Sequence, residues 1–113
     1  LYPHNPSSKN YKLWKKYYSG ATGLLSIVIK SKKKSSIIQF VNSLELFGIG
    51  YSWGGFESLA ILQELRSNKK DEYLQGRKYF RFNKDEHIVR LHIGLEDPKD
   101  LINDLKRSLR YIK

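Results

Sequence analysis

The chain has 113 residues, no cysteine and a hydrophobic content of 40%, values that describe one folded domain and exclude disulfides and thiolate metal sites. Its net charge of +10 at pH 7 raises the question of a nucleic-acid or anionic membrane partner. The basic residues are spread along the chain, apart from a cluster over residues 30–34, and no ribonucleoprotein or zinc-finger spacing accompanies them. We therefore expect no nucleic-acid partner, and a basic nucleic-acid-binding module is the alternative. No membrane partner is expected, because the longest apolar run, residues 24–29, is too short to cross a bilayer.

The first elements predicted along the chain are a short helix and a strand. An aromatic stripe over residues 11–18 predicts a helix that Ser7 or Ser8 caps and that the glycines of residues 20–23 end. Residues 24–29 lack polar alternation, which predicts a strand buried on both faces.

A second helix follows a polar connection. Ser35 or Ser36 is expected to cap it, and Gly48 is expected to end it in a left-handed conformation. Its apolar residues fall at three- and four-residue spacing, so they predict the face that packs on the core: Ile37, Phe40, Val41, Leu44 and Phe47.

Short strands are predicted next. Residues 49–53 are expected to form a strand that leads into a turn at Gly54 and Gly55, whereas residues 56–65 are interpreted as helical or irregular. Residues 78–82 and 86–93 predict a hairpin.

The closing helix has the clearest start, with Asp97 as cap and Pro98 at the first position. Its expected apolar stripe is Leu101, Ile102, Leu105, Leu109 and Ile112. Together the elements predict an α/β (α+β) fold in which helices pack on one face of a mainly antiparallel sheet. We expect residues 1–113 to form a single domain.

Residues 50–54, GYSWG, match the nucleophile-elbow pattern of serine hydrolases, with Ser52 as the nucleophile. The acid would be Asp71 or Asp85, and the base His87 or His92. That chemistry needs a large parallel sheet, for which this chain has too few strand candidates, so we interpret the match as chance. No metal site is predicted, since the three histidines lack metal-ligand spacing.

Arg90 lies in a predicted strand whose side chains alternate, so it points away from the fully apolar side. One hypothesis is that its guanidinium bridges a surface carboxylate such as Glu86 or Asp97. The other is an anion clamp, because the rigid fork of donors grips a substrate carboxylate bidentately. A strand would hold such a clamp more rigidly than a loop.

Two separate segments, YSWGGFESL at 51–59 and RLHIGLED at 90–97, resemble the pyridoxal-phosphate (PLP) enzymes of cysteine and methionine metabolism. Further blocks fit the same family: YPHNP at 2–6, SGATGLLS at 19–26 and DLINDL at 100–105. The resemblance runs over nearly all of the chain and is closest to the bacterial cystathionine β-lyase branch. It covers only the small C-terminal domain of such fold-type-I enzymes.

The resemblance implies roles for particular residues. Arg90 would bind the α-carboxylate of an amino-acid substrate, Ser52 and Trp53 would line the substrate site, and Tyr51 would lie beside them. Trp53 further implies the β-lyase branch, because related γ-synthases and γ-lyases usually have leucine there. The intact enzyme would then convert cystathionine to homocysteine, pyruvate and ammonia in the cytoplasm, as part of methionine biosynthesis and transsulfuration. A related γ-synthase or γ-lyase type of domain is the alternative.

The resemblance also implies what this chain lacks. The cofactor of the intact enzyme would be PLP, held by a large domain that carries the Schiff-base lysine, and no matching Ser-x-Thr-Lys segment occurs here. We therefore expect no catalytic or cofactor-binding residue in the chain and no activity of the chain alone. Its expected partners are that large domain, further copies in a tetramer and the amino-acid substrate. The chain begins with Leu1 rather than methionine, and we expect it to be a piece of a longer protein.

Overall fold

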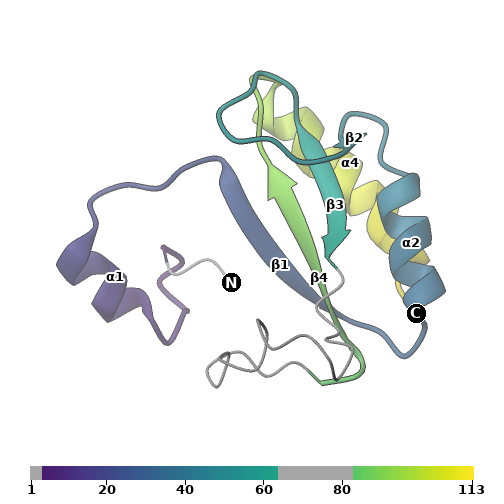
Figure 1. Cartoon of the computed structure of the whole chain (residues 1–113), viewed down its shortest axis with the longest axis horizontal. Coiled ribbons are helices and arrows are strands. Elements are labelled where there is room, and N and C mark those ends of the chain that lie inside the picture. The colour runs from purple at the N-terminus through teal and green to yellow at the C-terminus, as the bar shows by residue number, and fades with distance from the viewer. Residues whose placement is uncertain (1–3, 64–82) are drawn as a thin grey trace, which may run out of the picture.

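The computed structural model describes residues 4–63 and 83–113 (Figure 1). Within these ranges four strands form one sheet in the order β1-β4-β3-β2. The strand β4 (Glu86–His92) pairs antiparallel with both β1 (Leu24–Lys30) and β3 (Leu59–Gln63). The short β2 (Gly48–Ile49) runs parallel to β3. Antiparallel pairing thus dominates, which confirms the predicted sheet.

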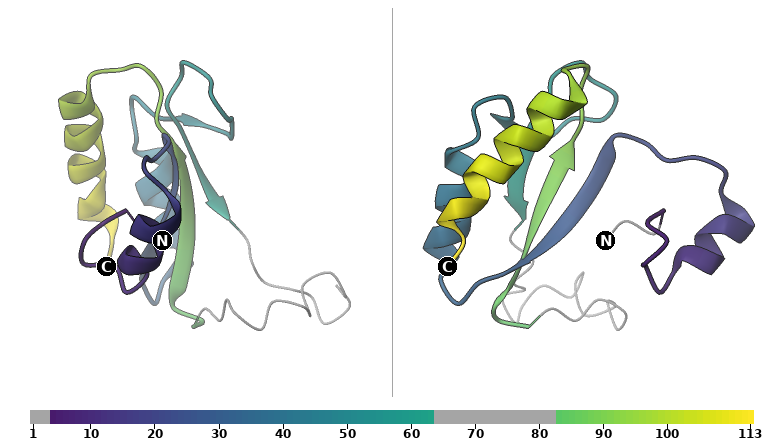
Figure 2. Two further views of the ribbon diagram at one scale, coloured as in Figure 1. Left: turned by 90° about the vertical axis from the view of Figure 1, so that its left-hand side faces the viewer. Right: turned by 180° about the vertical axis from the view of Figure 1, so that it is seen from behind.

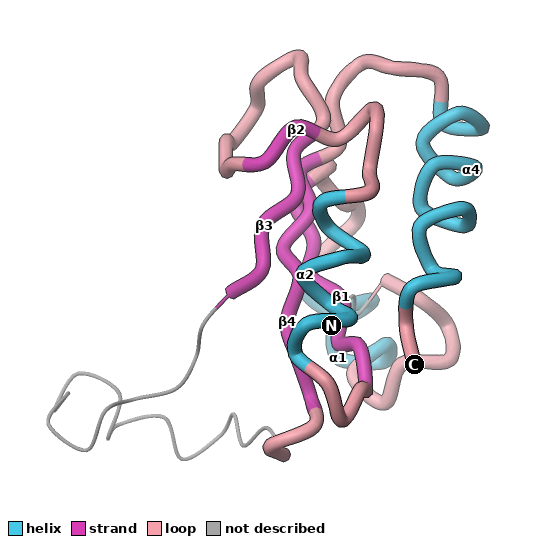
Figure 3. Tube along the Cα trace, turned by 90° about the vertical axis from the view of Figure 1, so that its right-hand side faces the viewer, coloured by secondary structure: helices cyan, strands magenta, loops and turns pink. Residues whose placement is uncertain are grey.

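The helices α2 (Lys34–Asn42) and α4 (Pro98–Ser108) cover one face of the sheet, as Figures 2 and 3 show. A turn of 3₁₀ helix, η1 (Leu109–Tyr111), continues α4. The arrangement is the predicted α/β fold with helices on one face. None of the helices in the described ranges is long and apolar enough to cross a membrane.

The core lies between the sheet and these two helices. All five predicted core positions of α2 and its following loop are buried, with Ile37 and Phe40 fully inaccessible. Alternate strand residues complete the layer: Leu25, Ile27 and Ile29 from β1, Ala60 and Leu62 from β3, and Val89 and Leu91 from β4. Burying each such large apolar side chain stabilises the fold by about 1.5–3 kcal/mol.

The opposite face of the sheet, called here the open face, has no described helix over it (Figure 2). Alternation and strand register place Arg90 at its centre, between Ser26 of β1 and Ile61 of β3. Most of β1 is only half-buried. The prediction that residues 24–29 are buried on both faces was therefore wrong, because β1 is an edge strand with one covered face.

The helix starts differ from those predicted. Asn10 precedes α1 (Tyr11–Tyr17) and Lys33 precedes α2, and neither side chain makes a capping hydrogen bond. The predicted caps, Ser7 or Ser8 and Ser35 or Ser36, were wrong. At α2 the reason is that Ser31 Oγ accepts the Lys33 N–H at 3.2 Å, so the helix begins earlier.

The end of α2 also differs, since the helix stops at Asn42 and Gly48 belongs to β2 instead of a left-handed cap. The Asp104 carboxylate of α4 accepts the backbone N–H groups of Glu45 and Leu46, which draws the chain toward α4.

The structure corrects one strand and confirms another. Residues 56–65 were interpreted as helical or irregular, but residues 59–63 form β3. The predicted strand 86–93 is β4, whereas its predicted hairpin partner, 78–82, lies outside the described residues. The predicted strand over 49–53 shortens to β2.

The closing helix is confirmed at its start, where Asp97 Oδ1 accepts the Lys99 N–H at 2.7 Å. Leu101 is buried as predicted, but Ile102 and Leu109 are half-exposed. Ile102 lies off the packed stripe, and Leu109 falls where α4 tightens into η1.

The N-terminal arm stands apart from this body. In Figures 1 and 2, α1 lies beyond the β1 edge of the sheet, and none of its residues is buried. Within the arm, aromatic rings contact one another: Trp14 lies edge-on to His4 and stacks on Tyr11. Leu13, Tyr17 and Tyr18 are each at least 60% exposed.

Candidate substrate site

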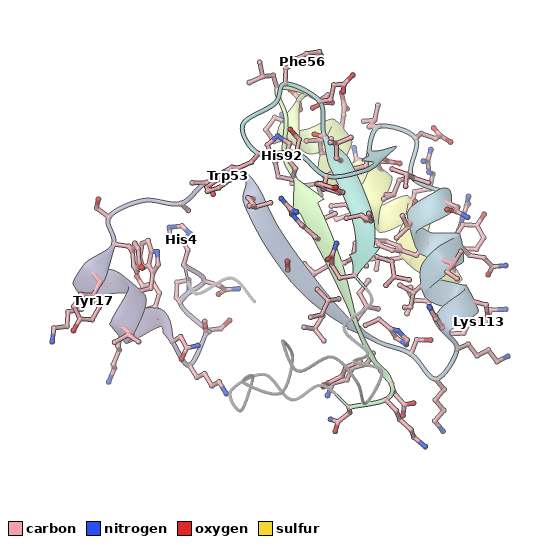
Figure 4. All side chains as sticks on the ribbon, in the orientation of Figure 1. His4, Tyr17, Trp53, Phe56, His92 and Lys113 are labelled. Carbon is pink, nitrogen blue, oxygen red and sulfur yellow. The ribbon has the colours of Figure 1, made fainter. Side chains whose placement is uncertain are left out.

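A loop over residues 50–58 folds across the end of β4, and it carries three of the predicted site residues. Backbone bonds close its base, from the Gly48 N–H to Ser58 and from the Gly50 N–H to Ala60. Gly54 has a φ of 81°, a conformation that glycine adopts without strain. Figure 4 shows Trp53 and Phe56 projecting outward from this loop, with His92 beneath it.

Arg90 reaches this loop from the open face. Its Nη2 donates to the backbone carbonyl of Ser52 at 3.1 Å, and its guanidinium carbon lies 5.6 Å from the ring centroid of Tyr51. The side chain is half-buried. One hydrogen bond and one ring contact fix its direction, and most of its five N–H donors have no hydrogen-bond partner among the described residues.

The alternative role of Arg90, a bridge to Glu86 or Asp97, is not what the structure shows. Glu86 lies 3.8 Å from Lys30 and accepts from the Asn83 N–H, while Asp97 accepts from Lys99. Within the described ranges the Arg90 guanidinium has no carboxylate partner. It is thus a half-buried cation whose charge the described residues leave uncompensated.

The structure brings Arg90, Ser52 and Tyr51 together, with Trp53 at the next position of the loop. Ser52 is half-buried and contributes its main-chain carbonyl, whereas Tyr51 is 72% and Trp53 82% exposed. The Tyr51 ring thus borders the guanidinium, an arrangement that can hold a small organic anion against an apolar wall.

Sequence reasoning missed two side chains that shape the loop. His92 is 4% exposed, and its Nε2 lies 2.9 Å from the Gly55 carbonyl. Glu96 accepts both the N–H and the hydroxyl of Ser58, at 2.9 and 2.7 Å. The alternation of β4 indicated where His92 lies, because residues 90 and 92 are two positions apart on a strand and therefore share a face of the sheet.

Glu96 is the clearest electrostatic feature of the loop. The hydrogen bonds from the Ser58 hydroxyl and N–H lower the pKa of Glu96 below its ordinary value. Gly94 lies against this network, because a Cβ there would clash with the Phe56 carbonyl oxygen and lie 2.7 Å from Glu96 Oε2. The end of β4 and the loop are thus closely packed.

The lysine cluster does not belong to this site. Lys30 pairs in register with Glu86, at the end of β4 opposite to His92, and Lys32 to Lys34 continue from there into α2. The dense positive charge is therefore at the other end of the sheet from Arg90.

The serine-hydrolase arrangement is absent from the described residues. His92 binds the Gly55 carbonyl and His87 the Ser31 carbonyl, so neither is bonded to the Ser52 hydroxyl. Asp71, one of the two candidate acids, lies outside the described residues. Ser52 also sits in a loop between two strands and not at a strand-to-helix turn. Among the described residues no cluster of three potential metal ligands occurs.

Comparisons with known proteins agree on one family. The family model of the Cys/Met metabolism PLP-dependent enzymes matches residues 1–110. The chain is 41% identical over 108 residues to the cystathionine β-lyase of Bordetella avium, covering 96% of this chain and 25% of that protein. It is 36% identical over 110 residues to the L-alanine/L-glutamate racemase of Wolbachia pipientis, covering 96% of this chain and 26% of that protein.

A solved structure agrees as well. A Campylobacter jejuni protein assigned as an O-acetylhomoserine (thiol)-lyase superposes with a TM-score of 0.66 at 29% identity, over 96% of this chain and 22% of that one. That protein has N'-pyridoxyl-lysine-5'-monophosphate at its position 205. The chain spans about a quarter of the length of the curated relatives it matches.

Proposed function

The chain belongs to the Cys/Met metabolism PLP-dependent enzymes, and from that premise we propose that it forms the substrate-binding C-terminal part of a carbon–sulfur lyase of the cystathionine β-lyase type. The observation that carries the proposal is the half-buried Arg90 guanidinium, held by the Ser52 carbonyl and lacking a carboxylate partner in the described ranges. An amino-acid substrate supplies the missing carboxylate.

Arg90 acts in this proposal by fixing the substrate's direction. Its free N–H donors grip the α-carboxylate, while the Ser52 carbonyl and the Tyr51 ring keep the guanidinium from turning. A substrate held at one end presents its α-C–H bond at a constant angle, and such positioning lowers a reaction barrier. Trp53 and Tyr51, which are largely exposed in this chain, border the bound amino acid in this proposal.

The cofactor of the family, PLP, supplies the electron sink that stabilises a carbanion. The described residues fit the substrate end of such a site, because they offer an anion clamp and no lysine beside it. The proposal therefore includes a lysine-bearing large domain as the partner of the open face, a tetramer for the intact enzyme and a cytoplasmic location. The chain alone would be inactive.

The reaction type rests on Trp53 and on the Bordetella avium relative. A γ-lyase type is the nearest alternative, since the human cystathionine γ-lyase is 34% identical over 114 residues. A racemase type is favoured by the Wolbachia relative. Products separate the three reactions. With one water consumed, cystathionine gives homocysteine, pyruvate and ammonia by β-elimination and cysteine, 2-oxobutyrate and ammonia by γ-elimination. A racemase instead interconverts the enantiomers of alanine or glutamate.

The test uses a hybrid enzyme, in which this chain replaces the segment that it matches in the Bordetella avium cystathionine β-lyase. We expect the hybrid to form pyruvate from cystathionine. Arg90→Ala should lower kcat/KM by about 10–100-fold, because charge-assisted hydrogen bonds contribute about 1.5–3 kcal/mol.

Arg110→Ala is the matched control, since Arg110 also lies over a tyrosine ring, at 5.1 Å, but belongs to η1 on the helix side. Its kcat/KM should stay within about twofold of the hybrid, as surface changes have small effects. Equal losses in the two variants would remove Arg90 from the site.

A further inference from the structure

Three side chains at the end of β4 bind the loop over residues 50–58 at successive points. Arg90 binds Ser52, His92 binds Gly55, and Glu96 binds Ser58. The Leu95 N–H adds a fourth bond, to the Phe56 carbonyl at 2.8 Å. The loop that carries Tyr51, Ser52 and Trp53 is thus fastened along its length by β4 and the residues after it.

His92 is the middle member of this series, and its environment fixes its hydrogen-bonding role. The Gly55 carbonyl only accepts hydrogen bonds, so His92 Nε2 carries the proton and donates it. Nδ1, the other ring nitrogen, is buried without a partner among the described residues. A buried polar atom without a partner is costly, so a histidine at this position lowers the stability of the fold.

The Gly55 peptide transmits the position of His92 to Ser52. A Cβ on Gly55 would lie 2.9 Å from Ser52 Oγ and 3.9 Å from His92 Nε2, so these three residues are packed against one another. The Ser52 carbonyl is in turn the hydrogen-bond acceptor that orients Arg90. A shift of the Gly55 carbonyl therefore moves the acceptor on which the direction of the guanidinium depends.

We propose that His92 is a positioning residue for substrate binding, which acts through its Nε2–H bond to Gly55 and thereby sets the Ser52 carbonyl against Arg90. The inference rests on the proposed function, because it concerns the same site. It assigns to His92 no contact with substrate or cofactor.

The hybrid enzyme tests this with two substitutions of His92. His92→Phe keeps a planar ring and removes the donor, and it should raise KM for the amino-acid substrate by about 5–10-fold, the effect of one lost hydrogen bond. His92→Gln places an amide N–H near the position of Nε2 and should return KM to within about twofold of the hybrid.

His87→Phe is the matched control. His87 is the other buried histidine of β4, and its Nε2 lies 3.1 Å from the Ser31 carbonyl at the opposite end of the strand. It should lower Tm about as much as His92→Phe and leave KM unchanged. If the two phenylalanine variants raise KM equally, or if His92→Gln does not restore it, the positioning role is wrong.

Two further readouts separate this inference from the proposed function. Arg90→Ala in the same hybrid tests the proposed function. If Arg90→Ala raises KM but His92→Phe leaves KM unchanged, the positioning role of His92 is wrong and the proposed function stands. Long-range ¹H–¹⁵N NMR spectra of the 113-residue chain report the tautomer without any activity. We expect the proton on Nε2, and a proton on Nδ1 with a bare Nε2 would overturn the inference, because His92 could not then donate to Gly55.

Discussion

At the scale of single residues, the loop over residues 50–58 depends on charged and polar side chains more than on apolar burial. Glu96 is the plainest case, because its carboxylate accepts two hydrogen bonds from Ser58, a residue that is 1% exposed. These bonds favour the ionised form, which is why the pKa of Glu96 is lowered.

This lowered pKa predicts a loss of stability in acid. A carboxyl group whose pKa is lower in the folded state contributes stability that is complete above its unfolded value, ordinarily 4.5, and that disappears as the pH falls through the folded value. We expect the urea midpoint of the chain to fall from about pH 4.5 downward, and the fall to be shallower in Glu96→Gln.

The measurement is urea unfolding at a series of values between about pH 6 and about pH 3, with Asp100→Asn as the control. Asp100 is an exposed carboxylate in the first turn of α4. An acid dependence in Glu96→Gln as steep as in the unchanged chain would show that Ser58 does not stabilise the ionised carboxylate.

Some residues in and around the candidate site were predicted from the sequence and others were missed, for a physical reason. Two sequence blocks that resemble one family predicted that Arg90, Ser52 and Tyr51 lie together, and the structure brings them together, while their role in binding substrate stays a prediction. His92 and Glu96 were missed because their partners, Gly55 and Ser58, lie 37 and 38 positions away in the chain. Such bonds depend on the pairing of β3 with β4, which no local pattern encodes.

At the scale of elements, the helix α4 serves both the core and the loop after α2. Asp104 is 5% exposed and accepts the N–H groups of Glu45 and Leu46, while Arg107 bonds to Asp104, Glu45 and the Ser43 carbonyl. The hydrogen bond to Glu45, with the charges of Glu45 and Asp104, raises the pKa of Arg107.

Asp104→Ala should therefore destabilise the chain by about 2 kcal/mol, because it leaves two backbone donors without their acceptor and removes one of the partners of Arg107. Asn103→Ala, at the neighbouring exposed position, should change stability by no more than about 0.5 kcal/mol. Chemical denaturation of both variants checks the difference. Similar small effects would mean that the loop after α2 is held by its apolar contacts alone.

Local sequence was sufficient to predict some of the helices and strands but not others. Asp97 and Pro98 predicted the start of α4, because capping is a contact between near neighbours. Residues 59–63 of β3 are a short apolar run, which fits a buried helix segment as well as a strand. These residues form a strand and not a helix because they pair with β4.

At the scale of the whole molecule, the sheet is covered on one face and open on the other. The open face carries the half-buried Val28 and Ile61, the latter in register with Arg90, and partly exposed apolar surface of this kind favours association. We expect the 113-residue chain to self-associate as its concentration rises.

Val28→Lys should shift this association toward the monomer, because it places a charge on the open face. Ile38→Lys is the matched control, since Ile38 is 43% exposed on α2 and lies off that face. Sedimentation velocity over a range of concentrations measures the effect. Association that both variants weaken equally would point to net charge and not to the open face.

The proposed role of the chain in substrate binding depends on whether Arg90 recognises a carboxylate. The most direct measurement is the ratio of kcat/KM for L-cystathionine to kcat/KM for its analogue amidated at the reacting α-carboxyl group, in the hybrid enzyme and in its Arg90→Ala variant. We predict a preference for the carboxylate of about 10–100-fold in the hybrid, nearly abolished by Arg90→Ala. An undiminished preference in the variant would contradict the assignment of Arg90 as the substrate clamp.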